Sequence, residues 1–276
     1  MSLNRRTALL LLACTLPLST FAAERCAHEA PRSLPLDLDG VKTVVFDIGA
    51  QSLSVASAAG GAASLSARAC ASSPSMLSQL QFTQARKGDK LVVTAARERS
   101  MPPWDSNDRY AHLIVDARLP ADLMVQVRVG AGDATVDGFR AVTADVGSGE
   151  LRVRNVKETF YADVGSGEIE AENVGALHVV TVGSGELAAR RVRGESKVGG
   201  VRSGELVISD AGGGIRIDSI GSGSASISDV VGAVRVADIG SGSLRARALR
   251  SDLRVDHVGS GSVRHSDVAG RIDVDD

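Results

Sequence analysis

Residues 147–192 read GSGELRVRNVKETFYADVGSGEIEAENVGALHVVTVGSGELAARRV, and this stretch contains three copies of a unit that begins with Gly-Ser-Gly-Glu. The copies begin at Gly147, Gly165 and Gly183. Further Gly-Ser-Gly triplets begin at residues 221, 240 and 259, and degenerate copies stand at 130–132 and 202–204. The successive intervals of 17, 18, 18, 19, 19, 19 and 19 residues indicate a repeat architecture.

Each unit carries apolar residues in one template, apolar-x-apolar-x-x-apolar, as at Leu151, Val153 and Val156. Alternation with a period of two indicates a strand with one buried face, and the third apolar residue lies past a bend. The template returns about nine residues later in the same unit, so each coil holds two short strands. In the earliest coils the second strand has two possible phases, because residues 159/161 and 160/162 both fit.

A single coil has almost no core, so such strands bury their apolar faces only by stacking in register. The sequence therefore predicts an all-β protein with a parallel β-helix, a β-solenoid of 17–19 residues per coil and about eight coils over residues 130–276. At a rise of ~4.8 Å per coil, eight coils would form a rod of about 38 Å. Parallel crossovers favour a right-handed coil.

The two corners of the coil have different turn chemistry. Glycine at the first corner permits positive φ and close approach of neighbouring coils. The serines between these glycines stack at one level, where their hydroxyls can bond to the turn backbone or to each other. The second corner carries residues that favour turns: Asn155, Asn173, Asp210, Asp229 and Asp267.

The N-terminus has the pattern of a secretory signal peptide, residues 1–22. Arg5 and Arg6 precede an apolar run, and small residues stand before the expected cleavage site after Ala22. A lipoprotein site at Cys14 is the alternative, although Leu12 fits that motif poorly. The apolar run is too short for an uncleaved membrane anchor, and we expect a mature chain without a transmembrane segment.

Removing the two arginines of the signal peptide leaves 29 basic against 33 acidic residues, a formal charge of −4. This balance provides no basic excess for nucleic acid. The two remaining cysteines, Cys26 and Cys70, would be exported to an oxidising compartment, periplasmic or extracellular. We therefore expect a disulfide between them, with two free thiols as the alternative.

Residues 23–129 lack the repeat and contain alternating runs such as 41–48, 91–96 and 113–129. They predict an antiparallel β region that caps the solenoid and prevents open-ended strand pairing. Residues 100–110 form a loop with the only tryptophan, Trp104, followed by Arg109 and Tyr110. This loop is a candidate recognition patch, or else its tryptophan packs over the end of the solenoid.

The Gly-Ser-Gly-Glu-Leu/Ile copies, together with Leu119-Pro120 and the alternating valines up to Val129, resemble the bacterial putative-adhesin family of β-strand-repeat proteins of unknown function. The chain is also similar to the head domain of auto-transporter adhesins. The resemblance covers residues 41–276 and rests on a coil motif. It implies an envelope-associated β-helix with an adhesive or surface role.

No catalytic constellation is visible in the sequence. The five histidines lack metal-ligand spacing, and residues 162–276 contain no aromatic Phe, Tyr or Trp on which a sugar could stack. We therefore expect a non-catalytic exported protein that presents an extended binding or structural surface to an envelope or surface protein or a glycan. A carbohydrate-active β-helix enzyme and an envelope sensory or regulatory protein are the alternatives.

An acidic column is the remaining candidate site. In-register stacking would place Glu150, Glu168, Glu186 and Glu205, preceded by Asp133, in one outward row at a spacing of ~4.8 Å. The row is either a solvated column offset by arginines on the same face or a Ca²⁺ site, since calcium accepts several carboxylate oxygens. No other cofactor is indicated.

Overall fold

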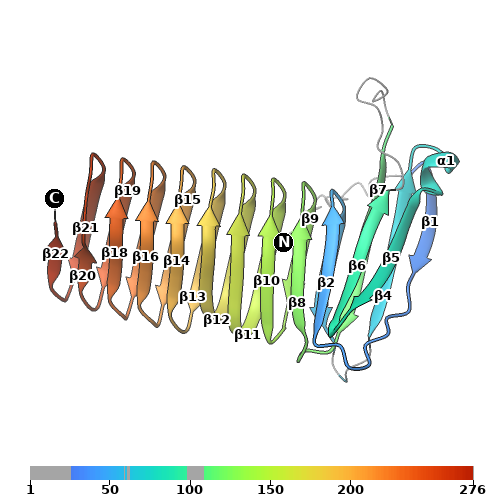
Figure 1. Cartoon of the computed structure of the whole chain (residues 1–276), viewed down its shortest axis with the longest axis horizontal. Helices are drawn as coiled ribbons and strands as arrows, with labels where there is room; N and C mark the ends of the chain where they lie inside the picture. Colours follow the sequence, from blue (N-terminus) through green and yellow to red (C-terminus); the bar gives the residue numbers. More distant parts are fainter. Residues whose placement is uncertain (1–25, 59, 61–62, 98–108, 276) are drawn as a thin grey trace, which may run out of the picture.

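The computed structural model describes residues 26–58, 60, 63–97 and 109–275. The predicted signal peptide and the alternative lipidation site at Cys14 lie outside these residues. The chain folds into a straight rod of stacked coils that ends in a wider, twisted β region (Figure 1). The predicted all-β solenoid with a β cap is confirmed.

Each coil of the rod contributes one strand to each of two facing parallel sheets. Both sheets include parts of the two longest strands, β11 (Glu150–Val164) and β12 (Glu168–Val182), which run through one corner of the coil without a break. One sheet adds β9 (Asp133–Asp137), β13 (Glu186–Val192), β15 (Glu205–Ala211), β17 (Ser224–Val230), β19 (Ser243–Leu249) and β21 (Ser262–Val268). The other adds β8 (Met124–Val129), β10 (Ala141–Val146), β14 (Ser196–Val201), β16 (Ile215–Ile220), β18 (Val234–Ile239), β20 (Leu253–Val255) and β22 (Ile272–Val274).

The register of the stacking follows the repeat. Glu150 pairs with Glu168, Glu168 with Glu186, and Glu186 with Glu205, so the same position of every unit falls in one column. Side chains of each column therefore face the same direction on successive coils. This in-register stacking makes the sequence repeat a continuous surface.

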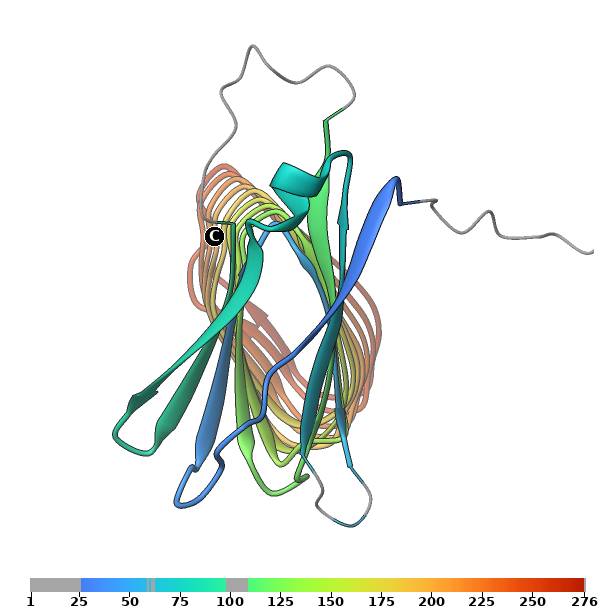
Figure 2. The same cartoon turned by 90° about the vertical axis from the view of Figure 1, so that its right-hand side faces the viewer.

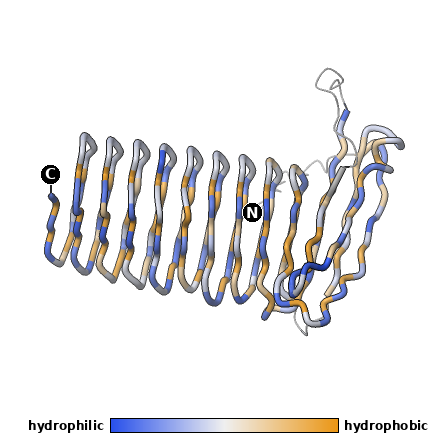
Figure 3. The backbone as a smooth tube through the Cα atoms, viewed as in Figure 1, coloured by the Kyte–Doolittle hydropathy of each residue, from blue (hydrophilic) through white to orange (hydrophobic). Residues whose placement is uncertain are grey.

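The core is the apolar template repeated along the rod, visible as alternating colours along the tube in Figure 3. Leu151, Val153 and Val156 are fully buried, as are their counterparts on the following coils. The open phase of the early second strand is resolved in favour of Phe160 and Ala162, which are buried, while Tyr161 is 40% exposed. Phe160 and Ala162 carry no polar side-chain atom, whereas burying Thr159 and Tyr161 would place two hydroxyl groups in the apolar interior, where each would need a hydrogen-bond partner.

The second corner is built on left-handed backbone. Asn155 has φ of 56° and donates from its side-chain amide to Asp137 Oδ1 at 2.8 Å, and Asn173 donates to Asn155 Oδ1 at 2.7 Å. Asparagine and aspartate tolerate this conformation better than other non-glycine residues. The same column also contains Arg191 and Ala248, both with φ of 55°, which residue type alone did not identify.

The N-terminal region combines antiparallel and parallel pairing (Figure 2). Its elements are β1 (His28–Ser33), β2 (Thr43–Gly49), β3 (Ser52–Ser57), β4 (Ser64–Ala71), α1 (Pro74–Leu77), β5 (Leu80–Lys87), β6 (Lys90–Arg97) and β7 (Ala111–Leu119). The pairs β1–β4, β4–β7 and β5–β6 are antiparallel, as predicted. However, β2 pairs in parallel with both β6 and β8, and β3 with both β7 and β9.

The coil formed by β2 and β3 is thus inserted between β6–β7 and the first coil of the rod, β8–β9. The parallel stacking begins before residue 130, and the cap extends both sheets of the rod before the antiparallel strands end them. This arrangement covers the apolar interior at the N-terminal end, where an open edge would invite pairing with other chains.

Candidate binding groove

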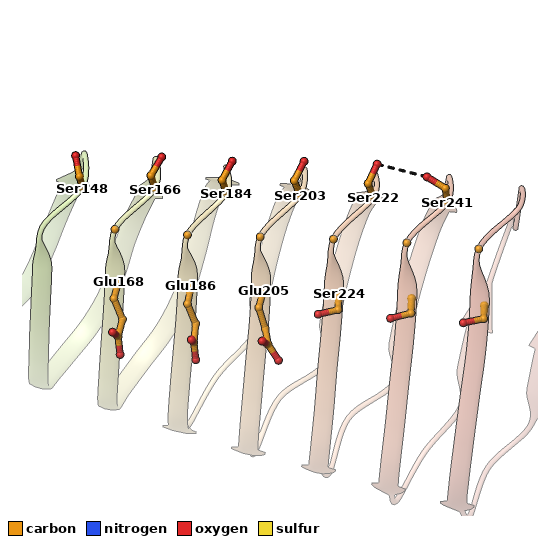
Figure 4. Close-up of a pocket in the computed structure, with 18 of the residues that line it drawn as sticks. Ser148, Ser166, Glu168, Ser184, Glu186, Ser203, Glu205, Ser222, Ser224 and Ser241 are labelled. Atoms are coloured by element: carbon orange, nitrogen blue, oxygen red, sulfur yellow. Dashed lines mark hydrogen bonds between the residues drawn. The ribbon is translucent and has the colours of Figure 1, made fainter.

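A long groove runs along the first corner of the solenoid, beside the Gly-Ser-Gly turns (Figure 4). It has a volume of about 790 Å³. One wall is the row of serines at the turns, the floor is the second glycine of each triplet, and the other wall is the position that follows it. The floor consists of Gly149, Gly167, Gly185, Gly204, Gly223, Gly242 and Gly261.

The floor must be glycine because the coils approach each other closely at this corner. A Cβ atom on Gly185 would overlap the carbonyl oxygen of Gly167 and lie 2.8 Å from the carbonyl carbon of Ser166. The turns are also tied to one another, since Ser184 N donates to Gly165 O at 2.8 Å and Glu186 N to Gly167 O at 3.0 Å. The missing side chains therefore permit both the close stacking and the hollow.

The serine wall is exposed along its length. Its hydroxyls point outward from the turn (Figure 4). The Oγ atoms of Ser222 and Ser241 lie 3.4 Å apart, within hydrogen-bonding distance. The serines that line the groove are Ser148, Ser166, Ser184, Ser203, Ser222, Ser241 and Ser260. The expected stacking of hydroxyls at one level is therefore present, and it forms a row of donors and acceptors one coil apart.

The opposite wall changes its chemistry along the rod. The predicted acidic column is brought together by the register, from Asp133 through Glu150 to Glu205. Ser224, Ser243 and Ser262 continue the same column beyond Glu205. The groove is therefore acidic in the half nearest the cap and neutral in the other half.

The acidic wall has an electrostatic cost at its centre. Partial burial, followed by the like charges of Glu205 and Glu168, raises the pKa of Glu186 above its usual range. The negative charge of Glu150 is offset by an ion pair, because Arg152 Nη2 lies 3.1 Å from its carboxylate. The predicted offset of the column by arginines therefore applies at its first glutamate.

The acidic column is not arranged as a compact metal centre. Over the described ranges, no three His, Cys, Asp or Glu side chains group closely enough to hold a metal ion. In-register stacking spreads the carboxylates along a line, whereas calcium requires six to eight oxygens around one point. The calcium hypothesis for Glu150, Glu168, Glu186 and Glu205 stays a prediction that titration can test.

The candidate recognition loop is only partly described. Trp104 lies outside the described residues, while Arg109 and Tyr110 precede β7. The Tyr110 hydroxyl accepts a hydrogen bond from the backbone N–H of Ala27 at 2.7 Å. The backbone N–H of Tyr110 donates a hydrogen bond to Ser72 Oγ at 3.2 Å. Tyr110 thus anchors the base of the loop to the cap.

The predicted disulfide is present. Cys26 and Cys70 are bonded across a sequence separation of 44 residues, with Cα atoms 5.4 Å apart. Cys70 is buried in β4, and β4 pairs with β1, the strand that begins two residues after Cys26. The bond therefore ties the start of the described chain to the capping sheet.

Comparisons with known proteins show the fold. The sequence matches no protein-family model and no curated protein. A protein from Parabacteroides distasonis named a putative lipid binding protein has a similar structure, with 15% identity, coverage of 87% of this chain and 97% of that chain, and a TM-score of 0.56. At this identity the likeness shows a shared fold and nothing more.

Two further solved structures are named putative adhesins. The one from Parabacteroides merdae is 12% identical, covers 87% of this chain and 97% of its own, and has a TM-score of 0.49. The one from Parabacteroides distasonis has the same identity and coverage and a TM-score of 0.45. Solved structures named putative adhesins are among those that this chain matches.

Proposed function

We propose that this chain is an exported, non-catalytic envelope protein that presents an extended, adhesin-like binding surface. The observation that supports the proposal most strongly is the continuous groove, which passes six Gly-Ser-Gly corners and the degenerate Arg-Ser-Gly corner at residues 202–204. The serine wall repeats with the spacing of the coils along the whole groove, so an elongated partner can make the same contact with it many times. Many weak, repeated contacts add up when they are held on one rigid scaffold.

The groove chemistry favours binding over catalysis. Glycoside hydrolysis uses two carboxylates that face each other across the bond to be cleaved. The carboxylates of this groove all stand on one wall, and serine hydroxyls stand on the other. Among the described residues, no histidine lines the groove to activate one of these serines.

Several observations fit a location outside the cytoplasm. A disulfide such as Cys26–Cys70 forms and persists in oxidising compartments. Residues 1–22 have the pattern of a signal peptide. Among the helices of the described residues, none has the length and apolarity needed to span a membrane. The partner we propose is a protein or glycan of the cell envelope.

The test is binding to intact cells of the bacterium that encodes the chain. The double variant Ser184→Tyr/Ser222→Tyr places two bulky rings on the exposed groove wall. The control, Ala233→Tyr/Ala237→Tyr, adds the same rings at exposed positions outside the groove. We expect saturable binding of the mature chain that falls about tenfold in the groove variant, or ~1.4 kcal/mol, and persists in the control.

The same assay separates the two kinds of partner. Treating the cells with protease removes a protein partner, and treating them with periodate oxidises a glycan partner. Wild-type protein that shows no saturable binding to untreated cells would refute the proposed function. Equal binding by the groove variant and the wild type would refute the groove as its site.

A further inference from the structure

The outward face of the sheet that contains β13 to β21 has two electrostatic halves. Near the cap, arginines on this face form ion pairs with glutamates. Arg152 lies 3.1 Å from both Glu150 and Glu170, and Arg154 lies 3.5 Å from Glu172. The pKa of Arg152 is raised, chiefly by Glu170. Arg152 and Arg154 are therefore already paired with carboxylates, and an anionic ligand would meet the acidic column in this half.

At the far end of the same face three arginines stand without acidic partners. Arg245 and Arg247 lie two residues apart on β19, and Arg264 on β21 is in register with Arg245. All three are exposed. No carboxylate of the described residues lies within 4.0 Å of their guanidinium groups, and none of their side chains forms a hydrogen bond with a described residue.

Two aspartates close to this arginine cluster in the strand register do not pair with it. Asp229 and Asp267 come directly after Ser228 and Ser266, which are in strand register with Arg247. Both aspartates belong to the left-handed corner column, and neither forms an ion pair with the arginine cluster. Like charges opposite each other on adjacent strands destabilise a sheet. The pairing of Arg245 with Arg264 is therefore a local cost that folding alone does not explain.

A hollow of about 380 Å³ lies beside the arginine cluster. It exists because the preceding coil has small side chains in the same columns, with Ser226 in register with Arg245 and Ser228 with Arg247. Both serines are half-buried and their hydroxyls have no hydrogen-bond partner among the described residues. Val207 lines the hollow on the side nearer the cap.

We propose that this hollow binds the sulfate or phosphate ester groups of an anionic glycan. Guanidinium groups form paired, charge-assisted hydrogen bonds with such oxyanions, and serine hydroxyls add donors. Adjacent coils are ~4.8 Å apart and alternate residues of a strand ~7 Å apart, so three arginines can surround one tetrahedral anion or contact two neighbouring ones. Recognition by charge needs no aromatic platform, which fits the absence of aromatic residues from positions 162–276.

This inference goes beyond the proposed function, because it names a second surface with its own ligand chemistry. The groove lies along the Gly-Ser-Gly corner, whereas the hollow lies on the outward face of β17, β19 and β21 and shares no residue with it. A glycan could therefore be held at the end of the rod while the groove engages another partner. The two surfaces can be disabled separately.

The test uses a fluorescein-labelled heparin hexasaccharide as the probe and the mature chain as the receptor. The variant Arg245→Ser/Arg247→Ser introduces the residues that the preceding coil has in these columns, so the fold should tolerate it. The control, Arg118→Ser/Arg216→Ser, removes two exposed arginines that lie outside the hollow and form no ion pair within the described chain.

We expect the variant to bind the probe about tenfold more weakly and the control to bind it within about twofold of wild type, where tenfold corresponds to ~1.4 kcal/mol. Binding should weaken as salt screens the charges. A single Arg264→Gln change should weaken binding about threefold. The groove variant Ser184→Tyr/Ser222→Tyr should keep full affinity for the probe, which separates a failure of this site from a failure of the groove.

Three results would overturn the assignment. Equal loss in the variant and the control would show that net charge alone attracts the probe. Equal binding of a fully desulfated hexasaccharide would show that the oxyanion is not recognised. Binding to vesicles of phosphatidylglycerol and phosphatidylcholine that depends on Arg245 and Arg247, without binding of the hexasaccharide, would assign the site to lipid headgroups.

Discussion

Replacing Gly185 with alanine tests whether the coils stack as closely as the structure shows. The added Cβ would overlap the carbonyl oxygen of Gly167 and come within 2.8 and 2.9 Å of the carbonyl carbon of Ser166 and the amide nitrogen of Gly167. All of these are backbone atoms, which cannot rotate away as a side chain could. The two coils must therefore separate locally at this corner.

The size of the effect follows from the bonds that hold the corner. Separation would weaken the hydrogen bonds from Ser184 N and Gly185 N to Gly165 O, at 2.8 and 3.1 Å, and from Glu186 N to Gly167 O, at 3.0 Å. Two or three such bonds at ~1 kcal/mol each, with an overpacking cost of ~1–3 kcal/mol, give about 3–6 kcal/mol. For a chain of this size we expect a fall of about 10 °C in melting temperature.

Gly200→Ala is the matched control, because it lies one strand further along the chain and is also a glycine. Its nearest neighbour would be the Ser219 hydroxyl oxygen at 3.1 Å, which can rotate away. The melting temperatures of both variants and the wild type are compared by circular dichroism. If Gly185→Ala melts within a degree of Gly200→Ala, the coils are not stacked as closely as we describe, and the reasoning about the groove floor is wrong.

Four further predictions concern single positions. Ser196 is fully buried with no hydrogen-bond partner for its hydroxyl, so Ser196→Val should stabilise the fold by ~1 kcal/mol in chemical denaturation; a destabilised variant would point to a partner that the fold needs. Ala248 has φ of 55°, so Ala248→Asn should raise the unfolding free energy by about 0.5–1 kcal/mol, and no gain would argue against a left-handed residue there. Because the pKa of Glu186 is raised in the folded state, the contribution of Glu186 to stability should fall as pH rises through that pKa. Glu186→Gln should therefore melt higher than wild type at pH 7 and equally at pH 3, and equal melting temperatures at pH 7 would contradict the strained carboxylate. Calcium should raise the melting temperature of the wild type only if the acidic column binds it. Unreduced mature protein should show no free thiol by mass spectrometry, and reducing the 44-residue Cys26–Cys70 loop should cost ~4 kcal/mol, whereas two alkylated cysteines would contradict the bond.

Much of the rod was predictable because the strand register follows directly from the spacing of the sequence repeat. Once the Gly-Ser-Gly copies are aligned, the inward apolar template, the serine row and the acidic column all follow. The phase at residues 159–162 did not follow, because both alternations fit until Phe160 is seen to fill the interior. The left-handed backbone of Arg191 and Ala248 did not follow either. The stacked neighbours impose this conformation on them, although their residue types do not favour it.

The cap was predicted only in outline. Strand runs were visible, but the insertion of β2 and β3 between β6–β7 and β8–β9 depends on pairing between segments far apart in the chain. Local pattern contains no information on such pairing. The arginine cluster was also missed, because the total charge of the chain is slightly acidic. Aligning the coils places Arg245 and Arg264 in one column, and that signal could have revealed it.

The most direct test of the central claim is to incubate the unmodified mature chain with isolated cell envelopes and measure both binding and cleavage. A non-catalytic binding protein should bind saturably and leave envelope polymers unchanged in size and in number of reducing ends. Bound protein should scale with the amount of envelope and be recovered intact. Release of shortened polymers, or no saturable binding to any envelope fraction, would contradict the account.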